Sequence, residues 1–155
     1  MKIYIIVLFT FFATTKAYCQ IENVYLQYNC GVCLGNKDFS IIIYKDQFSI
    51  ESTNEKNIKI VVESKHITKN VYFSAKDFDV LKAKIKALDV VEIIEDFQTG
   101  TDGNHTILGF GDTFSTIEYK IFGFHIEDKS RFLKFKEIVL YILKAAEIDP
   151  KLIYG

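Results

Sequence analysis

The amino-acid sequence predicts an α+β fold, in which an antiparallel β-sheet of about five to six strands is covered by two amphipathic helices. Short runs of alternating apolar and polar residues, separated by brief polar turns, predict strands that pair antiparallel. Two longer segments repeat apolar residues every three or four positions, which predicts helices with one buried face. The predicted order is strands, helix, hairpin, helix, so both helices are expected to lie on the sheet.

The first half of the chain supplies most of the predicted strands. Residues 21–28 alternate, with Val24, Leu26 and Tyr28 on one face. Residues 39–44 are apolar on both faces, which predicts a central strand buried on both sides. Three shorter runs are expected to extend the sheet, the last of them being either a strand or the lead-in to a helix: 48–50, 58–62 and 71–73.

Ser74 and Asp77 have the spacing of a capping box, in which a side-chain oxygen accepts a backbone N–H at the start of a helix. The spacing predicts a helix over 75–88 with one apolar face, formed by Phe78, Leu81, Ile85 and Leu88. Strands at 105–110 and 114–122 are predicted to follow as a hairpin.

A final helix is predicted to run to about residue 147, with Asp128 or Ser130 as its N-cap. Pro150 prevents its continuation because proline lacks the backbone N–H that a helix interior needs. The apolar face expected to be buried consists of Phe132, Phe135, Val139, Ile142 and Ala146.

The first 19 residues have the layout of a secretory signal peptide. Lys2 is followed by about ten mostly apolar residues and then by small and polar residues up to Gln20. This run is too short to span a bilayer, which needs about 20 apolar residues. We therefore expect 1–19 to be a signal peptide and 20–155 to be a single α+β domain, exported to the periplasm or outside the cell, with no transmembrane span.

Cys19 has two interpretations. Ala17 and Cys19 fit the small residues that precede a cleavage site before Gln20, and cleavage after Ala17 is the alternative. Cys19 as the lipid-bearing cysteine of a lipoprotein is the minority interpretation, because Lys16 and Tyr18 depart from the small residues that precede such a cysteine.

The charge of the predicted mature chain argues against nucleic-acid binding. The whole chain has a formal net charge of −1, and removing 1–19 takes away Lys2 and Lys16 but no acidic residue. Arg131 is the only arginine, and the sequence has no basic patch with interleaved aromatic residues. The expected partner is a protein or a component of the cell envelope, and the sequence leaves the oligomeric state open.

Cys30 and Cys33 are the candidate site residues of the mature chain. They stand at Cys-x-x-Cys spacing, with Gly31 between them, and an exported chain lies in an oxidising compartment. We therefore expect a structural disulfide between them. One alternative is a redox-active pair, although such pairs usually lie at the start of a helix. The other is a metal site, which would need two more ligands.

No other residues form a recognisable catalytic or metal-binding set. The histidines at 66, 105 and 125 are scattered, so neither a metal site nor a cofactor is predicted. Asp102 and Asp112 have the surroundings of turn residues. Asn104-His-Thr106 matches a glycosylation sequon, which matters only in a host that glycosylates.

Several features occur together in the predicted mature chain. Cys30 and Cys33 precede an apolar run that ends at Tyr44, Asp46 follows in a turn, and a Thr-Asp loop at 101–102 precedes the hairpin. In this combination the chain resembles a family of small exported bacterial domains of unknown function. It departs from the family in the shorter cysteine spacing, in the absence of a proline after Cys33 and in the absence of a glycine in the turn. The resemblance implies a small exported domain and carries no activity.

These observations predict an exported, non-enzymatic domain that binds another macromolecule or an envelope component. A secreted inhibitor or an immunity protein is a special case of this function. The alternative is a thiol–disulfide oxidoreductase that uses Cys30 and Cys33. The reduction potential of the pair would separate the two, because structural disulfides lie below about −300 mV.

Overall fold

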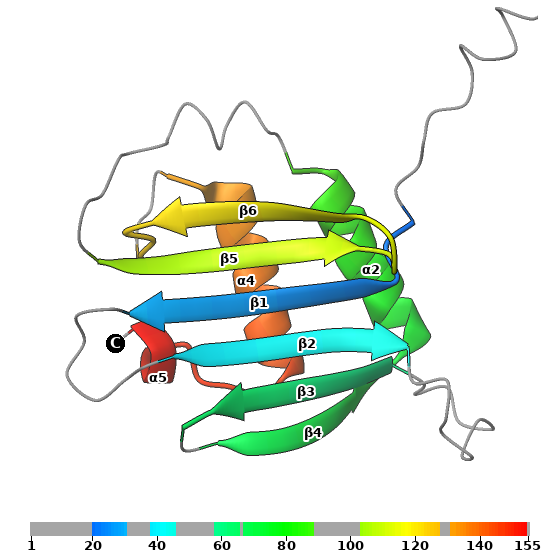
Figure 1. The fold of residues 1–155 in the computed structure, drawn as a ribbon, viewed down its shortest axis with the longest axis horizontal. Coiled ribbons are helices and arrows are strands. Elements are labelled where there is room, and N and C mark those ends of the chain that lie inside the picture. Colours follow the sequence, from blue (N-terminus) through cyan, green and yellow to red (C-terminus); the bar gives the residue numbers. More distant parts are fainter. Residues whose placement is uncertain are drawn as a thin grey trace, which may run out of the picture.

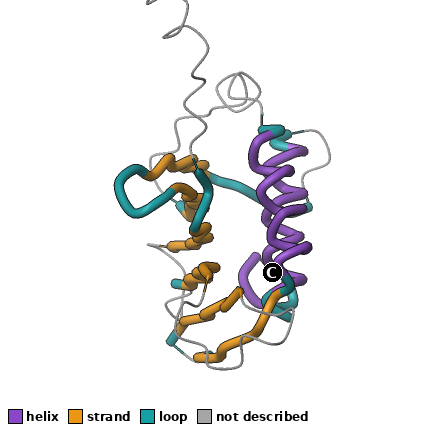
Figure 2. The backbone as a smooth tube through the Cα atoms, turned by 90° about the vertical axis from the view of Figure 1, so that its right-hand side faces the viewer, coloured by secondary structure: helices purple, strands orange, loops and turns teal. Residues whose placement is uncertain are grey.

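The computed structural model describes residues 20–30, 38–45, 58–65, 67–88, 103–127 and 131–154. Its strands form one antiparallel sheet in the order β4-β3-β2-β1-β5-β6, with the helices on one face (Figures 1 and 2). The strands are β1 (Asn23–Cys30), β2 (Phe39–Lys45), β3 (Ile58–Ser64), β4 (Thr68–Phe73), β5 (Asn104–Gly111) and β6 (Thr116–Phe122). The helices are α2 (Ala75–Lys86), α4 (Leu133–Ala145) and the short α5 (Lys151–Tyr154).

The predicted α+β class, an antiparallel sheet with helices, is confirmed. Residues 46–57, 89–102 and 128–130 lie between the described elements, so the predicted order of elements along the complete chain stays a prediction. The signal-peptide residues 1–19 also lie outside the described residues. None of the described helices is long and apolar enough to cross a membrane.

β1 lies inside the sheet and fixes its register. Leu26 stands opposite Ile41 of β2 and opposite Leu108 of β5, and all three side chains are buried. The face predicted for this strand is confirmed, because Val24 and Tyr28 are buried on the same side as Leu26. Strand pairing thus directs one residue in two toward the helices.

The central position predicted for β2 is confirmed, but the burial of both its apolar faces is not. Ile41 and Ile43 are fully buried, whereas Ile42 between them is 38% exposed. In the part of the chain that the structure describes, the helices lie on one side of the sheet, and Ile42 points to the other side (Figure 2). β2 pairs with β1 and β3, and the return strand expected at 48–50 lies outside the described residues.

α2 begins where the sequence predicted. The Asp77 N–H donates to Ser74 Oγ over 3.0 Å, which satisfies one of the unpaired donors of the first turn. Its buried residues are Phe78, Leu81 and Ile85, as predicted, but the helix ends at Lys86, so Leu88 lies beyond it and is partly buried. Residues 71–73 belong to β4 rather than to a helix lead-in, and the hairpin of β5 and β6 is confirmed.

α4 begins later than predicted, and the expected cap at Asp128 or Ser130 is wrong. Phe132 holds the N-cap position with a left-handed φ of 53°. Its ring is buried, with its centroid 6.5 Å from that of Phe124, so tertiary burial sets this helix start in place of a side-chain cap. The predicted apolar face is confirmed, since Phe132, Phe135, Val139, Ile142 and Ala146 are all buried.

An aromatic cluster joins the end of the chain to the core. Gly123 has a φ of +61°, a conformation that glycine adopts without strain, and it turns the chain from β6 so that Phe124 is buried. The Phe124 ring lies 5.2 Å from Phe135 and 5.6 Å from Tyr154, measured between centroids. The Tyr154 hydroxyl lies 3.2 Å from Oγ1 of the buried Thr106. This contact links α5 to β5.

Candidate binding surface on the uncovered sheet face

The side of the sheet that faces away from the helices forms a continuous surface, which we call the open face. Successive side chains alternate across a sheet, so each strand contributes every second residue to it. Register places one row across the strands: Asn70, Val61, Ile42, Tyr25, Gly109 and Glu118. A second row contains Tyr72, Lys59, Tyr44, Asn23, Gly111 and Thr116.

A groove of about 420 Å³ crosses the middle of the open face. Phenol rings line it together with an aliphatic side chain, two amides and one carboxylate: Tyr25, Tyr44, Ile42, Asn23, Gln27 and Glu118. Amides donate and accept hydrogen bonds, and tyrosine combines an apolar ring with a polar hydroxyl. The groove is therefore suited to contacts that mix apolar packing with neutral hydrogen bonds.

Tyr25 is held in place within this groove. Its ring lies over Gly109, where the missing side chain leaves room for it. Its hydroxyl donates to the Glu118 carboxylate. Partial burial, followed by the hydrogen bond and the negative charge of Glu118, raises the Tyr25 pKa to about 12. At neutral pH the phenol thus remains protonated and cannot act as a general base.

His105 lies on the open face near the end of β1, between Asn29 of β1 and Phe122 of β6. Its Nε2 is 3.1 Å from the Asn29 amide nitrogen, and its ring centroid is 5.7 Å from that of Phe122. Burial, and then the charge of Lys120, lower the His105 pKa, while Asp38 opposes them. The ring is therefore neutral at pH 7 and adds no charge to the open face.

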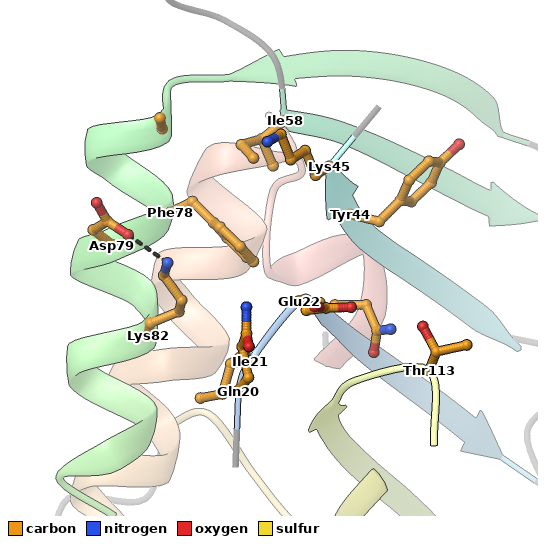
Figure 3. Close-up of a pocket in the computed structure, with 12 residues that line it drawn as sticks. Gln20, Ile21, Glu22, Tyr44, Lys45, Ile58, Phe78, Asp79, Lys82 and Thr113 are labelled. Carbon is orange, nitrogen blue, oxygen red and sulfur yellow. Dashed lines mark ion pairs between the residues drawn. The ribbon is translucent and has the colours of Figure 1, made fainter. Parts of the chain in front are cut away.

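A second cavity, of about 500 Å³, lies between α2 and the ends of β1 and β2 (Figure 3). Phe78 projects from α2 toward the 20–22 segment, whereas Lys82 runs along the helix toward Asp79. Lys82 pairs with Asp79 at 2.5 Å, and its ammonium lies 5.0 Å from the centre of the Phe78 ring. Gln20, Lys45 and Ile58 line this cavity and are next in sequence to 1–19 and 46–57, which lie outside the described residues. The described lining alone supports no function for this cavity.

The structure places the residues that the sequence singled out as follows. Cys30 is buried at the end of β1, and its backbone N–H lies 3.4 Å from Asp38 Oδ1. Cys33 and Cys19 lie outside the described residues, so the predicted disulfide and the lipidation of Cys19 stay predictions. Among the described residues, no group of three or more His, Cys, Asp or Glu could hold a metal ion.

The turn role predicted for Asp112 is confirmed, because its carboxylate accepts the N–H groups of Phe114 and Ser115 at 2.8 Å each. Asp102 and His66 lie outside the described residues, and His125 is exposed. Asn104, the sequon residue, donates from its amide to the Tyr28 hydroxyl over 3.0 Å.

Sequence reasoning did not identify the open face as a site. The available signal was the excess of aromatic and amide residues at alternate positions of the predicted strands, such as Tyr25 and Gln27. Comparison with protein-family models gave no match, and comparison with curated proteins gave no significant relative.

Proposed function

We propose that this chain is a small exported, non-enzymatic binding module whose open face contacts a protein partner. The observation that carries the proposal is a sheet face that no described element covers, with tyrosines and amides at its centre. Tyrosine is enriched in protein-binding surfaces, because it contributes a large contact area at a small entropic cost. A secreted inhibitor and an immunity protein both fall within this proposal.

The charge of the open face supports a protein partner over a polyanion or an anionic membrane. In the six described strands this face carries two lysines and two glutamates, which balance: Lys59, Lys120, Glu63 and Glu118. Nucleic acids and anionic lipids require a basic excess. Among the described residues of the open face, the exposed large apolar side chains are Ile42 at 38% and Tyr72 at 48%, and they favour a partner with a neutral, partly apolar surface.

The scaffold supports recognition without large rearrangement. The groove residues lie on strands of one hydrogen-bonded sheet, and Glu118 fixes the Tyr25 hydroxyl. A surface ordered before binding loses less entropy when the partner arrives. The arrangement therefore favours a folded partner that docks on the sheet as a rigid body.

A photo-crosslinking experiment tests the proposed surface. A photoreactive phenylalanine analogue would replace Ile42 or Tyr44 in the groove, and a control variant would carry it at Val80, a 40% exposed residue of α2. We expect groove variants expressed in the native host to form one discrete protein adduct that the Val80 variant lacks. No adduct from the groove, or the same adduct from all three positions, would contradict the proposal.

Export is the second part of the proposal and is tested separately. N-terminal sequencing of the protein recovered from the periplasm or the medium should begin at Gln20, or at Tyr18 if cleavage follows Ala17. Protein that remains in the cytoplasm and begins at Met1 would overturn the assignment of export and leave the open face to be tested on its own.

A further inference from the structure

β6 is an edge strand with a defined pattern of outward backbone groups. In the part of the chain that the structure describes, no strand lies beyond it (Figure 1). Asp112 N donates to Ser115 O, and Gly123 N donates to Asn104 O, at 3.0 Å each. In an antiparallel pair of strands, hydrogen-bonded and non-hydrogen-bonded residue pairs alternate. These two bonds therefore show which residues of β6 bond to β5. The odd-numbered residues of β6 bond to β5, while the even-numbered residues direct their N–H and C=O groups outward: Thr116, Glu118, Lys120 and Phe122.

Two of the outward residues of β6 carry opposite charges and are equally far from Tyr119. Glu118 and Lys120 lie on either side of Tyr119 and point to the same open face. Next to Tyr119 on the other face, Ile117 is 43% exposed although it lies on the helix side of the sheet. A long edge strand with an exposed apolar residue is suited to pairing with a further strand.

The opposite edge, β4, also has an exposed apolar residue, Tyr72, but it lacks a pair of opposite charges that could select a register. Ser64 N donates to Ile67 O, so the outward residues of β4 are Thr68, Asn70 and Tyr72, none of which is charged. Lys69 points toward the helices, where its ammonium lies 3.0 Å from the Glu147 carbonyl oxygen. An inward-pointing charge is a known protection of sheet edges against pairing. The two edges are therefore not equivalent.

We propose that β6 pairs antiparallel with β6 of a second copy of this chain, about a two-fold axis at Tyr119. This interface goes beyond the proposed function. In this register Glu118 stands opposite the partner's Lys120, and Lys120 stands opposite the partner's Glu118. A shift of the partner by two residues in either direction places Glu118 opposite Glu118, or Lys120 opposite Lys120. Opposite charges across strands stabilise a pair and like charges destabilise it, so the charges select this register.

The backbone and the other face agree with the same register. The even-numbered residues meet in hydrogen-bonded pairs, which gives about eight backbone hydrogen bonds at two per pair. On the helix side, Ile117 stands opposite the partner's Ile121 and loses its exposure to water. Glu118 retains acceptor capacity beside its bond from Tyr25, because a carboxylate has two oxygens. The interface is isologous, as expected for a closed dimer, and joins the two open faces into one sheet surface.

Charge reversal tests the pairing in the purified exported chain by sedimentation over a range of concentrations. Lys120→Glu or Glu118→Lys alone places like charges opposite at both pairs and should weaken dimerisation by about tenfold or more. The double variant E118K/K120E restores opposite charges and should return the dissociation constant to within about threefold of wild type. Circular dichroism melts of each variant confirm that the monomer is folded.

Disulfide trapping gives an independent readout. At the axis the two residues 119 form a non-hydrogen-bonded pair with Cα atoms about 4.5 Å apart, which is within the range of a disulfide. Tyr119→Cys should therefore give a covalent dimer on mild oxidation, whereas Asn70→Cys on β4 and the wild type should not. A wild type that stays monomeric at all concentrations would overturn the proposal. A dimer that neither traps through residue 119 nor recovers in the double variant would overturn it as well.

Discussion

The ring of Tyr25 occupies the space that a side chain at Gly109 would need. A Cβ built at Gly109 would lie 2.0 Å from Cζ of Tyr25 and 2.5 Å from its hydroxyl oxygen. The same hydroxyl donates to Glu118 on the next strand. Gly109 thus allows Tyr25 to reach across β5 and to meet a carboxylate 93 positions away in the sequence.

Gly109→Ala should separate the Tyr25–Glu118 contact from the stability of the fold. The new methyl group meets the far end of a side chain on the open face, so the ring can rotate away. We expect a loss of stability below about 1 kcal/mol, since alanine also lowers the entropy of the unfolded chain. The Tyr25 pKa should fall from about 12 toward its usual value of 10.0, which a spectrophotometric titration measures.

Gly111→Ala is the matched comparison on the same strand. A Cβ there would lie 2.0 Å from the backbone oxygen of Ser115, which cannot move without opening the hairpin turn. We expect a loss of about 1–3 kcal/mol in denaturant melts, as for overpacked sites. Equal losses for the two variants would show that Tyr25 is as rigid as the backbone.

The carboxylate of Asp112 should make the stability of the β5–β6 turn depend on pH. The N–H groups of Phe114 and then Ser115 lower its pKa below the usual 3.8. A carboxyl group with a lowered folded-state pKa stabilises the fold above its unfolded-state pKa and loses that contribution as the pH falls through the folded-state value. The stability difference between wild type and Asp112→Ala should therefore be constant at neutral pH and shrink below about pH 3.8.

Asp112→Asn provides the control for this titration, because its amide oxygen accepts the same two N–H groups without ionising. Its stability difference from Asp112→Ala should show no pH dependence between about pH 3 and 7. An Asp112 carboxyl group that titrates at or above its usual pKa in an NMR experiment would contradict the role of these two hydrogen bonds.

Local patterns predicted the elements whose determinants are local. The start of α2 was predictable because Ser74 and Asp77 are three residues apart, so that the Asp77 N–H donates to Ser74 Oγ and the Ser74 hydroxyl donates to the Asp77 carboxylate. The start of α4 was not predictable in this way, because Phe132 takes the N-cap position through its burial near Phe124, eight positions earlier. A search for hydroxyl or carboxyl side chains at the N-cap position cannot detect such packing.

The candidate site was the least predictable part of the molecule. The pattern of residues 39–44 shows two apolar faces, but it cannot show which face the helices cover. The exposure of Ile42, which points away from the helices, could therefore not be predicted. Tyr25 and Glu118 meet only because β1, β5 and β6 are neighbours in the sheet. The site depends on sheet order and register, whereas the sequence reports on one strand at a time.

Phe135→Ala should be among the most destabilising changes in α4. The Phe135 side chain is 1% exposed, and its ring packs edge-on at 5.2 Å from Phe124. Removing a buried phenylalanine leaves a cavity and costs about 3–5 kcal/mol. Leu140→Ala on the same helix is the control, because Leu140 is 37% exposed and its loss should cost less than about 1 kcal/mol. Similar midpoints for both variants in urea would contradict the packing described for this helix.

The proposed disulfide between Cys30 and Cys33 should contribute little to the stability of the fold. The Cys30 side chain is 6% exposed at the end of β1, which suits a structural bridge better than a reactive thiol. A bridge across two intervening residues removes little entropy from the unfolded chain, since loop-entropy arguments give about 3 kcal/mol for a 15-residue loop and less for a shorter one. Replacing both cysteines by serine should therefore cost only about 1–2 kcal/mol and leave the sheet intact.

Mass spectrometry after alkylation of the non-reduced protein, recovered from the periplasm or the medium, measures whether the bridge exists. Two alkylated thiols at positions 30 and 33 would rule it out. A reduction potential below about −300 mV would identify a structural disulfide, and a markedly higher one would support the thiol–disulfide oxidoreductase instead. If the double serine variant does not fold at all, the pair contributes far more than a short loop can, and a metal-binding role or an early role in folding would have to replace the disulfide.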